Sequence, residues 1–356
     1  MAIRKHIYKL PALILSGMRS KRLISIFIVI SVVAAASAYT VLTHGQKRQL
    51  IVYTADAYVR ETNYLLAQFH SSTGNPVAPA RGGGSYTDAR EIGQGAPADI
   101  LISVALNAYQ RNYLGARYSG WAVAFAADQM VISYSNATLN STAAVHVIHA
   151  FQNASASNSS SAFYGAFYNL TSGRIKVGIS NPDSDPAGLR AYLALEIAGF
   201  LYAGNQSYFL QRASDNNGTV SASNAAELVS PLEFGSIQFL FIYRSAAISD
   251  HIRYITLPPQ LNQGDPNLSA FYSRFSYTLV GGAVNASPIY LFVSVMANSS
   301  LNAEAYSFTY FLLNSSSELE NFGLMALKVP LLFYNKMPRQ FSNMIREGEM
   351  DVGGTL

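Results

Sequence analysis

The chain has 356 residues, of which 50% are apolar and 12% are charged, so it is long enough to form two domains with a sizeable core. Its formal net charge of +4 comes from the N-terminus: eight of the 24 Lys and Arg residues lie before residue 49, whereas no acidic residue occurs before Asp56. The remainder is acidic on balance, which excludes a basic nucleic-acid-binding surface. With no Cys in the chain, disulfides, thiolate metal sites and a lipid-modified Cys are also excluded.

The N-terminal segment predicts attachment to a membrane. Residues 23–43 contain no charged side chain and are numerous enough to span a bilayer. The basic leader at residues 1–22 should stay in the cytoplasm, which orients the rest of the chain outward. The alternative is a signal peptide cleaved after Ala36-Ser37-Ala38. We expect a single N-terminal anchor in the cell membrane and an extracellular folded part.

The following residues predict alternating strands and helices. Strands are expected at residues 49–53, 76–80 and 99–104, and as a pair on either side of Asp128 within 121–134. Helices are expected at residues 58–71 and from 87–92 onward. Between the second strand and its helix lies the loop Gly82-Gly83-Gly84-Ser85.

The second half continues the alternation. Residues 153–161 are rich in Ser, Asn and Ala and predict an exposed loop. Strands are expected at 174–179, 237–243, 252–257 and 289–296, and helices at 191–203 and 303–313. The tail after Pro338 has no clear periodicity and is expected to be loosely ordered. This alternation predicts an α/β protein with mostly parallel sheets.

Eleven Asn-x-Ser/Thr motifs predict a glycoprotein, unless some occur by chance in a chain rich in Asn and Ser. They begin at Asn136, Asn140, Asn153, Asn158, Asn169, Asn205, Asn217, Asn267, Asn285, Asn298 and Asn314. The low proportion of charged residues also suits acidic surroundings, in which carboxylates lose their charge.

The glycine-rich loop is a candidate anion site. Backbone N–H groups at the start of a helix bind anions, and the Ser85 hydroxyl adds a donor. No Lys follows the glycines, so this is not a nucleotide-binding P-loop. The simpler alternative is a tight turn.

Two carboxylates stand out in the second half. Asp185 precedes a predicted helix, and Glu233 precedes a predicted strand. Each could be a solvated cap or turn residue, or the two could form the acid and base of a glycan-active enzyme. His146 and His149 lack a third metal ligand and are expected to be structural.

Three segments resemble the signature loops of the archaeal tungstate/molybdate-binding proteins, the solute receptors of ABC importers. They are residues 180–190 (SNPDSDPAGLR), 231–236 (PLEFGS) and 242–245 (IYRS). Further similar pieces, including Ala98-Asp99-Ile100, occur in the family's order from about residue 50 to 338.

The resemblance implies a type II periplasmic-binding-protein fold, with two α/β lobes, a hinge and a ligand cleft. We expect residues 48–127 and 249–338 in one lobe, 128–248 in the other, and 339–356 as a tail. It also implies a binding protein that is not an enzyme and has no cofactor. Its ligand would be tungstate or molybdate, and its partners an ABC permease and its ATPase.

Carried onto this chain, the family's oxyanion contacts fall on Ala57, Gly84, Ser85 and Tyr243, and its metal-binding carboxylates on Asp185 and Glu233. Tungsten and molybdenum accept extra oxygen ligands, whereas sulfur and phosphorus do not, so such a pair would select against sulfate. The family's Ala-Gly-Ser after the first strand is Ala55-Asp56-Ala57 here, which removes a hydroxyl and adds a carboxylate. The alternatives are a receptor for phosphate, sulfate or another anion, a glycan-active enzyme, and a sensory or adhesive ectodomain.

Overall fold

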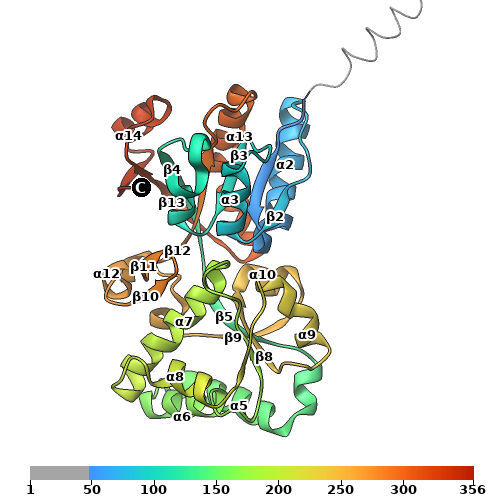
Figure 1. Cartoon of the computed structure of the whole chain (residues 1–356), viewed down its shortest axis with the longest axis vertical. Coiled ribbons are helices and arrows are strands. Elements are labelled where there is room, and N and C mark those ends of the chain that lie inside the picture. The colour runs from blue at the N-terminus through green and yellow to red at the C-terminus, as the bar shows by residue number, and fades with distance from the viewer. Residues whose placement is uncertain (1–47) are drawn as a thin grey trace, which may run out of the picture. The chain divides into compact units, whose positions relative to one another are not determined.

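Residues Gln49–Leu356 form two α/β lobes, each built around its own sheet (Figure 1). The computed structural model describes residues 48–356. The predicted leader at residues 1–22 and the predicted anchor at 23–43 lie outside this range. Among the helices of residues 48–356, none has the length and apolar character needed to cross a bilayer.

The first lobe contains a mixed sheet of seven strands in the order β14-β13-β4-β12-β3-β1-β2. The strands are β1 Val52–Ala55, β2 Arg81–Gly83, β3 Ile100–Ser103, β4 Trp121–Asp128, β12 Ile289–Val295, β13 Met325–Tyr334 and β14 Asp351–Gly354. Strand β1 is parallel to β2 and β3, whereas β12 is antiparallel to β3 and β4. The helices of this lobe are α2 Val59–Thr73, α3 Ser85–Gly93, α4 Arg111–Leu114, α13 Asn302–Asn314 and α14 Ser342–Glu347.

The second lobe contains a sheet of five strands in the order β7-β6-β8-β5-β9, with an added hairpin. These strands are β5 Met130–Tyr134, β6 Val177–Gly178, β7 Thr219–Val220, β8 Phe239–Tyr243 and β9 Arg253–Thr256, and the hairpin is β10 Ser276–Leu279 and β11 Gly282–Asn285. Its helices are α5 Thr142–Ser157, α6 Ser160–Leu170, α7 Pro186–Ala198, α8 Tyr208–Asp215, α9 Val229–Glu233, α10 Arg244–Ser249, α11 Pro259–Asn262 and α12 Ser269–Tyr272.

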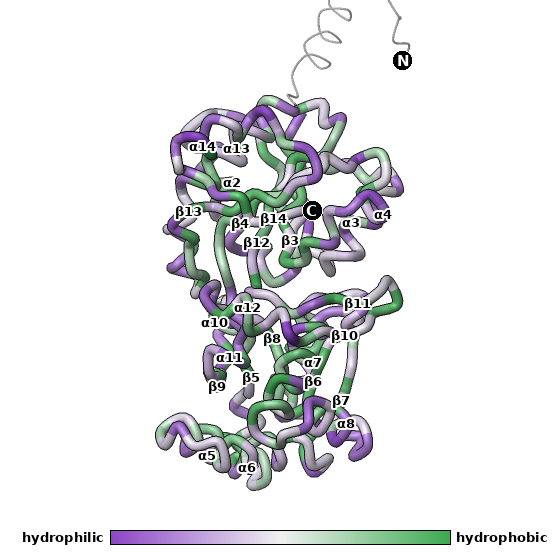
Figure 2. Tube along the Cα trace, turned by 90° about the vertical axis from the view of Figure 1, so that its left-hand side faces the viewer, coloured by the Kyte–Doolittle hydropathy of each residue, from purple (hydrophilic) through white to green (hydrophobic). Residues whose placement is uncertain are grey.

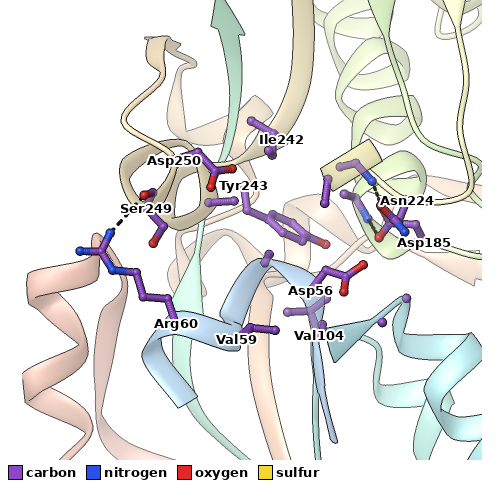
Figure 3. A pocket seen from close by; sticks show the side chains of 18 residues that line it. Asp56, Val59, Arg60, Val104, Asp185, Asn224, Ile242, Tyr243, Ser249 and Asp250 are labelled. Carbon is purple, nitrogen blue, oxygen red and sulfur yellow. Dashed lines mark hydrogen bonds between the residues drawn. The ribbon is translucent and has the colours of Figure 1, made fainter. Parts of the chain in front are cut away.

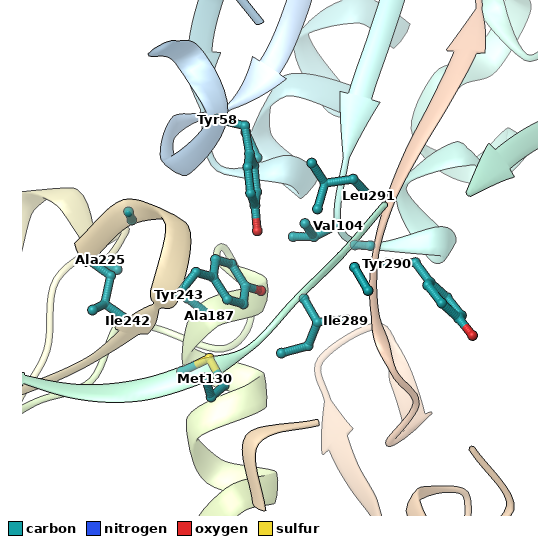
Figure 4. Packing of buried hydrophobic residues seen from close by; sticks show 14 of the residues in the cluster. Tyr58, Val104, Met130, Ala187, Ala225, Ile242, Tyr243, Ile289, Tyr290 and Leu291 are labelled. Atoms are coloured by element: carbon teal, nitrogen blue, oxygen red, sulfur yellow. The ribbon is translucent and has the colours of Figure 1, made fainter. Parts of the chain in front are cut away.

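The central strands form the core of each lobe because they are covered on both faces. Every residue of β4 and β12 is buried, and both strands are largely hydrophobic along their length in Figure 2. Strands buried on both faces lack the alternation of polar and apolar residues seen in half-exposed strands. At the junction of the lobes, the rings of Tyr58 and Tyr243 lie 5.9 Å apart (Figure 4).

The lobes are joined at two crossings, each held by a buried polar side chain. At the first, Asp128 accepts hydrogen bonds from the Tyr58 hydroxyl (2.9 Å), the Gln129 amide (2.7 Å) and the Ser245 hydroxyl. Burial raises the pKa of Asp128, although these hydrogen bonds oppose the shift. At the second, Arg190 of α7 donates to the carbonyl (2.7 Å) and hydroxyl (3.0 Å) oxygens of Ser287.

The structure confirms several predicted elements. Helices α2 and α13 match the predictions for residues 58–71 and 303–313, and β4 and β5 flank Asp128 as expected. The sequence predicted that the chain returns to the first lobe after residue 248, but in the structure it returns near residue 287. Residues 249–286 belong to the second lobe, because β9 pairs with β5 and α11 packs on α7. Both sheets also mix parallel and antiparallel pairs.

Three local predictions are wrong. Residues 153–161 are not a loop: α5 extends to Ser157, and α6 starts after Asn158 and the capping residue Ser159. The strand expected at 76–80 is only a single bridge at Val77, and the paired strand is β2. The tail is ordered, because β14 pairs with β13, and Phe341 and Met350 are fully buried.

Candidate functional site

A cavity of about 280 Å³ lies between the two lobes (Figure 3). Four of the residues predicted from the sequence line it: Ala57, Gly84, Asp185 and Tyr243. Asp56, Arg60, Asn224, Ser249 and Asp250 also line it. The cavity therefore brings together segments separated by more than 180 residues of sequence.

The first wall of the cavity follows β1. This fully buried strand ends at Ala55, and the chain turns through the 3₁₀ helix η1 (Asp56–Tyr58) into α2. The turn points the half-buried Asp56 carboxylate toward Asp185 across the cavity (Figure 3). Burial raises the pKa of Asp56, and the charges of Asp185 and Glu227 raise it further.

The second wall is the glycine-rich loop between β2 and α3. Gly84 precedes α3, and no side chain caps this end of the helix. The first amides of a helix have no acceptor within the helix, so they can bind an anion. Ser85 is 1% exposed and does not itself line the cavity, and its hydroxyl has no hydrogen-bond partner within residues 48–356. The loop thus offers unpaired donors of two kinds.

Gly84 also marks the contact between the lobes. A Cβ at this position would lie 2.8 Å from the Ser184 carbonyl oxygen of the opposite lobe. On the other side of the cavity, Arg60 donates a hydrogen bond to the Ser249 carbonyl (3.1 Å). The Ser249 hydroxyl donates in turn to Glu61 (3.1 Å). These contacts hold the lobes in a closed arrangement.

Asp185 caps the helix that starts the opposite wall. Its Oδ1 accepts a hydrogen bond from the Ala187 amide (3.1 Å), and its Oδ2 accepts one from the Ala225 amide (2.8 Å). Pro186 takes the first helical position, where no N–H is needed. Burial raises the pKa of Asp185, and the hydrogen bond from Ala187 opposes the shift. Both carboxylate oxygens therefore already have structural partners.

Tyr243 ends strand β8 and is 2% exposed. Its hydroxyl has no hydrogen-bond partner and lies at the same end of the cavity as Asp56 and Asp185 (Figure 3). Burial raises its pKa well above the usual value, and the charge of Asp185 adds to the shift. Tyr243 is therefore a neutral donor that this structure leaves unused.

A buried cation lies behind this end of the cavity. Arg190 is 7% exposed and follows the cavity-lining Ala187 by three residues, one helical turn along α7. Its Nη atoms bond only to neutral groups, on Ser287 and Gln263. Burial lowers the pKa of Arg190, and its charge acts on Tyr243. In the described part of the chain, no carboxylate accepts a hydrogen bond from Arg190.

The structure does not bring Glu233 to this cavity. Helix α9 turns the apolar Leu232 inward, so the next residue, Glu233, points outward and is exposed. It lines a separate cavity of about 230 Å³ with His251 and Arg253. Strand β8 contributes Ile242 and Tyr243 to the interlobe cavity, and neither is a carboxylate. The expected metal-binding pair of Asp185 and Glu233 is therefore not formed.

Other acidic side chains approach the cavity instead, but they do not form a metal centre. Asp56 and Asp250 line it at opposite ends (Figure 3). Within residues 48–356, no group of three or more His, Asp or Glu side chains is placed to hold a metal ion. The sequence drew attention to Asp56, because this residue stands where the related family has Gly. It gave no sign of Arg60, Ser249 or Asp250, because only lobe closure brings them together.

Sequence comparisons identify related proteins along most of the chain. Residues 50–318 match the family model of bacterial extracellular solute-binding proteins. A solute-binding protein from Sulfurisphaera tokodaii is 39% identical over 317 residues, which cover 86% of this chain and 83% of that protein. The molybdate/tungstate-binding protein WtpA of Pyrococcus abyssi is 26% identical over 192 residues, covering 48% of this chain and 56% of that protein.

Solved structures share the fold. The periplasmic molybdate-binding protein of Azotobacter vinelandii has a TM-score of 0.54 at 16% identity, covering 78% of this chain and 99% of that one. The sulfate-binding protein SubI of Mycobacterium tuberculosis has a TM-score of 0.55 at 14% identity, covering 86% and 94%. At these identities the likeness supports the two-lobed binding-protein fold and no particular ligand.

Proposed function

The chain belongs to the family of bacterial extracellular solute-binding proteins, and on that basis we propose that it is the receptor of an ABC importer for a small oxyanion. Tungstate and molybdate are the leading ligands. The interlobe cavity is the binding site, and Ala57, Gly84, Ser85 and Tyr243 are its oxyanion contacts.

The observation that carries this proposal is the set of unpaired donors on and next to the wall of the cavity. Tyr243 lines the cavity and Ser85 follows the lining residue Gly84, and within residues 48–356 neither buried hydroxyl has a hydrogen-bond partner. A buried hydroxyl without a partner costs about 1–3 kcal/mol, so such groups are rare unless a ligand or water satisfies them. The amides at the start of α3 add further donors. An oxyanion would accept hydrogen bonds from all of them.

The buried charge of Arg190 favours an anion at the same place. Its guanidinium acts electrostatically on Tyr243 of the cavity wall, and opposite charges attract more strongly where water is excluded. The carboxylates of Asp56 and Asp185 oppose binding, because their negative charges repel an anion. The negative charge of Asp185 is partly offset by the hydrogen bonds that the Ala187 and Ala225 amides donate to it. Asp56 has no such partners within residues 48–356, which favours phosphate or another proton-bearing anion as a second candidate.

The choice of tungstate or molybdate rests on the relatives and on the signature segments. WtpA proteins, named as molybdate/tungstate-binding, align with about half of this chain. Since Glu233 lies outside the cavity, expansion of the metal's coordination by two carboxylates is not part of the proposal. The metal oxyanion would be held by hydrogen bonds.

The family confirms two expectations about chemistry. Its members bind solutes and do not transform them, so the chain is not an enzyme, and they carry no cofactor. The geometry agrees, because a glycan-active pair of Asp185 and Glu233 would need both carboxylates in one cavity.

Transport also requires a location and partners. We propose that residues 23–43 anchor the chain to the cell membrane with the lobes outside, where a permease and its ATPase receive the solute. The sequons fit this location, since all but one of their eleven Asn residues are exposed and Asn169 is half-buried. Mass measurement of protein from native membranes would test both the anchor and the glycans.

The binding proposal predicts a ligand-dependent rise in stability. We expect the melting temperature of the full-length protein to rise with tungstate or molybdate. A ligand at 100 times its Kd adds about 2.7 kcal/mol to the free energy of unfolding. A thermal-shift panel should include sulfate, phosphate and chloride. If no oxyanion changes the melting temperature, the proposed function is wrong.

A Tyr243→Phe substitution should separate ligand binding from stability. Without ligand, the variant should be as stable as the natural protein or more so, because it loses a buried hydroxyl that has no partner. Oxyanion affinity should fall about 10- to 100-fold, since a hydrogen bond to a charged group contributes about 1.5–3 kcal/mol. Glu233→Gln, outside the cavity, is the matched control and should keep full affinity in calorimetry. A loss of affinity in the control alone would place the ligand elsewhere.

A further inference from the structure

From the position of Asp56, we infer that the cavity selects oxyanions that carry one proton, and that the Asp56 carboxylate accepts the hydrogen bond from the ligand's O–H group. The ligand class would include hydrogenphosphate, hydrogenarsenate and, at acidic pH, hydrogenmolybdate and hydrogentungstate. This inference rests on the proposed function, because it concerns an oxyanion in the same cavity.

The first step is that Asp56 differs from the other buried acids of the lobe junction. Asp128 accepts four hydrogen bonds from the protein, and Asp185 accepts two. The Asp56 carboxylate accepts none from the described part of the chain, although it lies in the cavity wall. Its lone pairs are therefore open to a ligand.

The second step is that Gly82 leaves room for the Asp56 carboxylate. Its Oδ1 lies against Gly82, where a Cβ would come within 2.8 Å. The same Cβ would lie 2.5 Å from the Val59 side chain. The glycine thus provides room for a carboxylate turned toward the cavity.

The third step is the match between donors and acceptors. Ser85, Tyr243 and the α3 amides donate, so they satisfy the unprotonated oxygens of an oxyanion. Asp56 is an acceptor at the same end of the cavity as the Tyr243 hydroxyl (Figure 3). A fully deprotonated oxyanion has no hydrogen to offer it and would be repelled. An oxyanion with one O–H group satisfies every one of these groups.

The groups that face Asp56 do not neutralise it. Burial and two nearby carboxylates raise its pKa, which shows that negative charge dominates its surroundings. The Arg60 guanidinium lines the same cavity but bonds to the Ser249 carbonyl. The titratable and charged groups around Asp56 are Asp88 of α3, Asp185 before α7, Glu227 of the η6 helix (Ala226–Leu228), Tyr243 of β8, Asp250 after α10 and Arg60 of α2.

Mass action makes the inference measurable. At a pH where Asp56 is ionised and the free oxyanion is fully deprotonated, forming the complex takes up one proton. The Kd then rises about tenfold for each unit of pH. Sulfate carries no proton near neutral pH, whereas phosphate does, so phosphate should bind far more tightly than sulfate at pH 7.

The test is calorimetry on the full-length protein and on Asp56→Asn, with phosphate, sulfate, molybdate and tungstate between pH 5 and 8. Titrations in two buffers of different ionisation enthalpy give the number of protons taken up. For the natural protein, we expect close to one proton per molybdate at neutral pH. The Asn side chain donates where Asp accepts, so the variant should lose phosphate affinity about tenfold and gain sulfate affinity about tenfold. Glu233→Gln makes the same change of charge outside the cavity and should alter neither.

The outcomes separate this inference from the proposed function. If the natural protein binds molybdate or tungstate at neutral pH without proton uptake, the inference fails and the oxyanion receptor stands. If Asp56→Asn tightens phosphate and sulfate equally, Asp56 merely repels anions, and the inference again fails. If no oxyanion binds the natural protein at any pH, the proposed function itself fails. Proton uptake by the natural protein decides the question even if the variant does not fold.

Discussion

The folded unit is expected to be more stable at pH 5 than at pH 8, by several kcal/mol. Burial raises the pKa of Glu61 to about 7 and that of Asp88 to about 8, from ordinary values of 4.5 and 3.8. Both side chains are almost fully buried, and Asp88 Oδ2 and Glu61 Oε2 have no hydrogen-bond partner. Each charged form therefore loses hydration without full compensation.

The direction follows from proton binding. At a pH between its ordinary pKa and its raised pKa, each carboxyl group is protonated in the folded state and ionised in the unfolded state. Its stabilising contribution is complete below the unfolded pKa and is lost as the pH rises through the folded pKa. One pKa unit corresponds to about 1.4 kcal/mol, so the two groups together give an effect of about 6 kcal/mol between pH 5 and pH 8. The pKa values of Asp56, Asp128, Asp185 and Asp250 shift in the same direction.

Urea unfolding at pH 5, 6.5 and 8 measures this effect. Asp88→Asn should flatten the pH dependence, mainly between pH 5 and 8, because the amide does not ionise. Glu91→Gln lies on the same helix but is exposed, and it should leave the slope unchanged. Equal or greater stability at pH 8 would contradict the buried, protonated state of these groups. The result would also bear on the sequence expectation that the low-charge surface suits acidic surroundings.

Gly84→Ala is expected to weaken oxyanion binding about 5- to 150-fold. The new Cβ would lie 2.8 Å from the Ser184 carbonyl oxygen, a distance that real Cβ atoms do not reach. Because Gly84 and Ser184 belong to different lobes, the clash is relieved by opening the cavity. Overpacking of this kind costs about 1–3 kcal/mol, and here the cost falls on the closed state that surrounds the ligand.

The unfolding free energy of the unliganded variant should change little, since the lobes can part without disturbing either core. Gly165→Ala is the matched control: a Cβ on Gly165, in α6, meets no atom within 4 Å. Calorimetry with the tightest oxyanion and thermal unfolding without ligand measure the two effects. Unchanged affinity in Gly84→Ala would mean that the closed contact between Gly84 and Ser184 is not needed for binding.

The sequence alone determined the fold family and predicted part of the candidate site. Ordered segments over nearly 290 residues carried the resemblance to two-lobed binding proteins, and helix periodicity located α2 and α13. Ala57, Gly84, Asp185 and Tyr243 were predicted together and do line one cavity. Such residues sit where a strand meets a helix, and the carboxyl ends of sheet strands gather at one edge. Local order along the chain is enough to identify them.

What only the tertiary structure decided depends on contacts between distant segments. Glu233 follows the buried Leu232, and its outward direction is set by how α9 packs on its lobe. Strand β14 contains two glycines and has no strand pattern, yet it is ordered because β13 supplies its hydrogen bonds. The cavity also depends on tertiary structure. The sequence showed Asp56 as a change in a family motif, but Asp56 faces Asp185 across the cavity only because the two lobes close. Sequence patterns record the local preferences of the backbone, whereas the direction of a side chain across a cleft is fixed by packing between segments far apart in the chain.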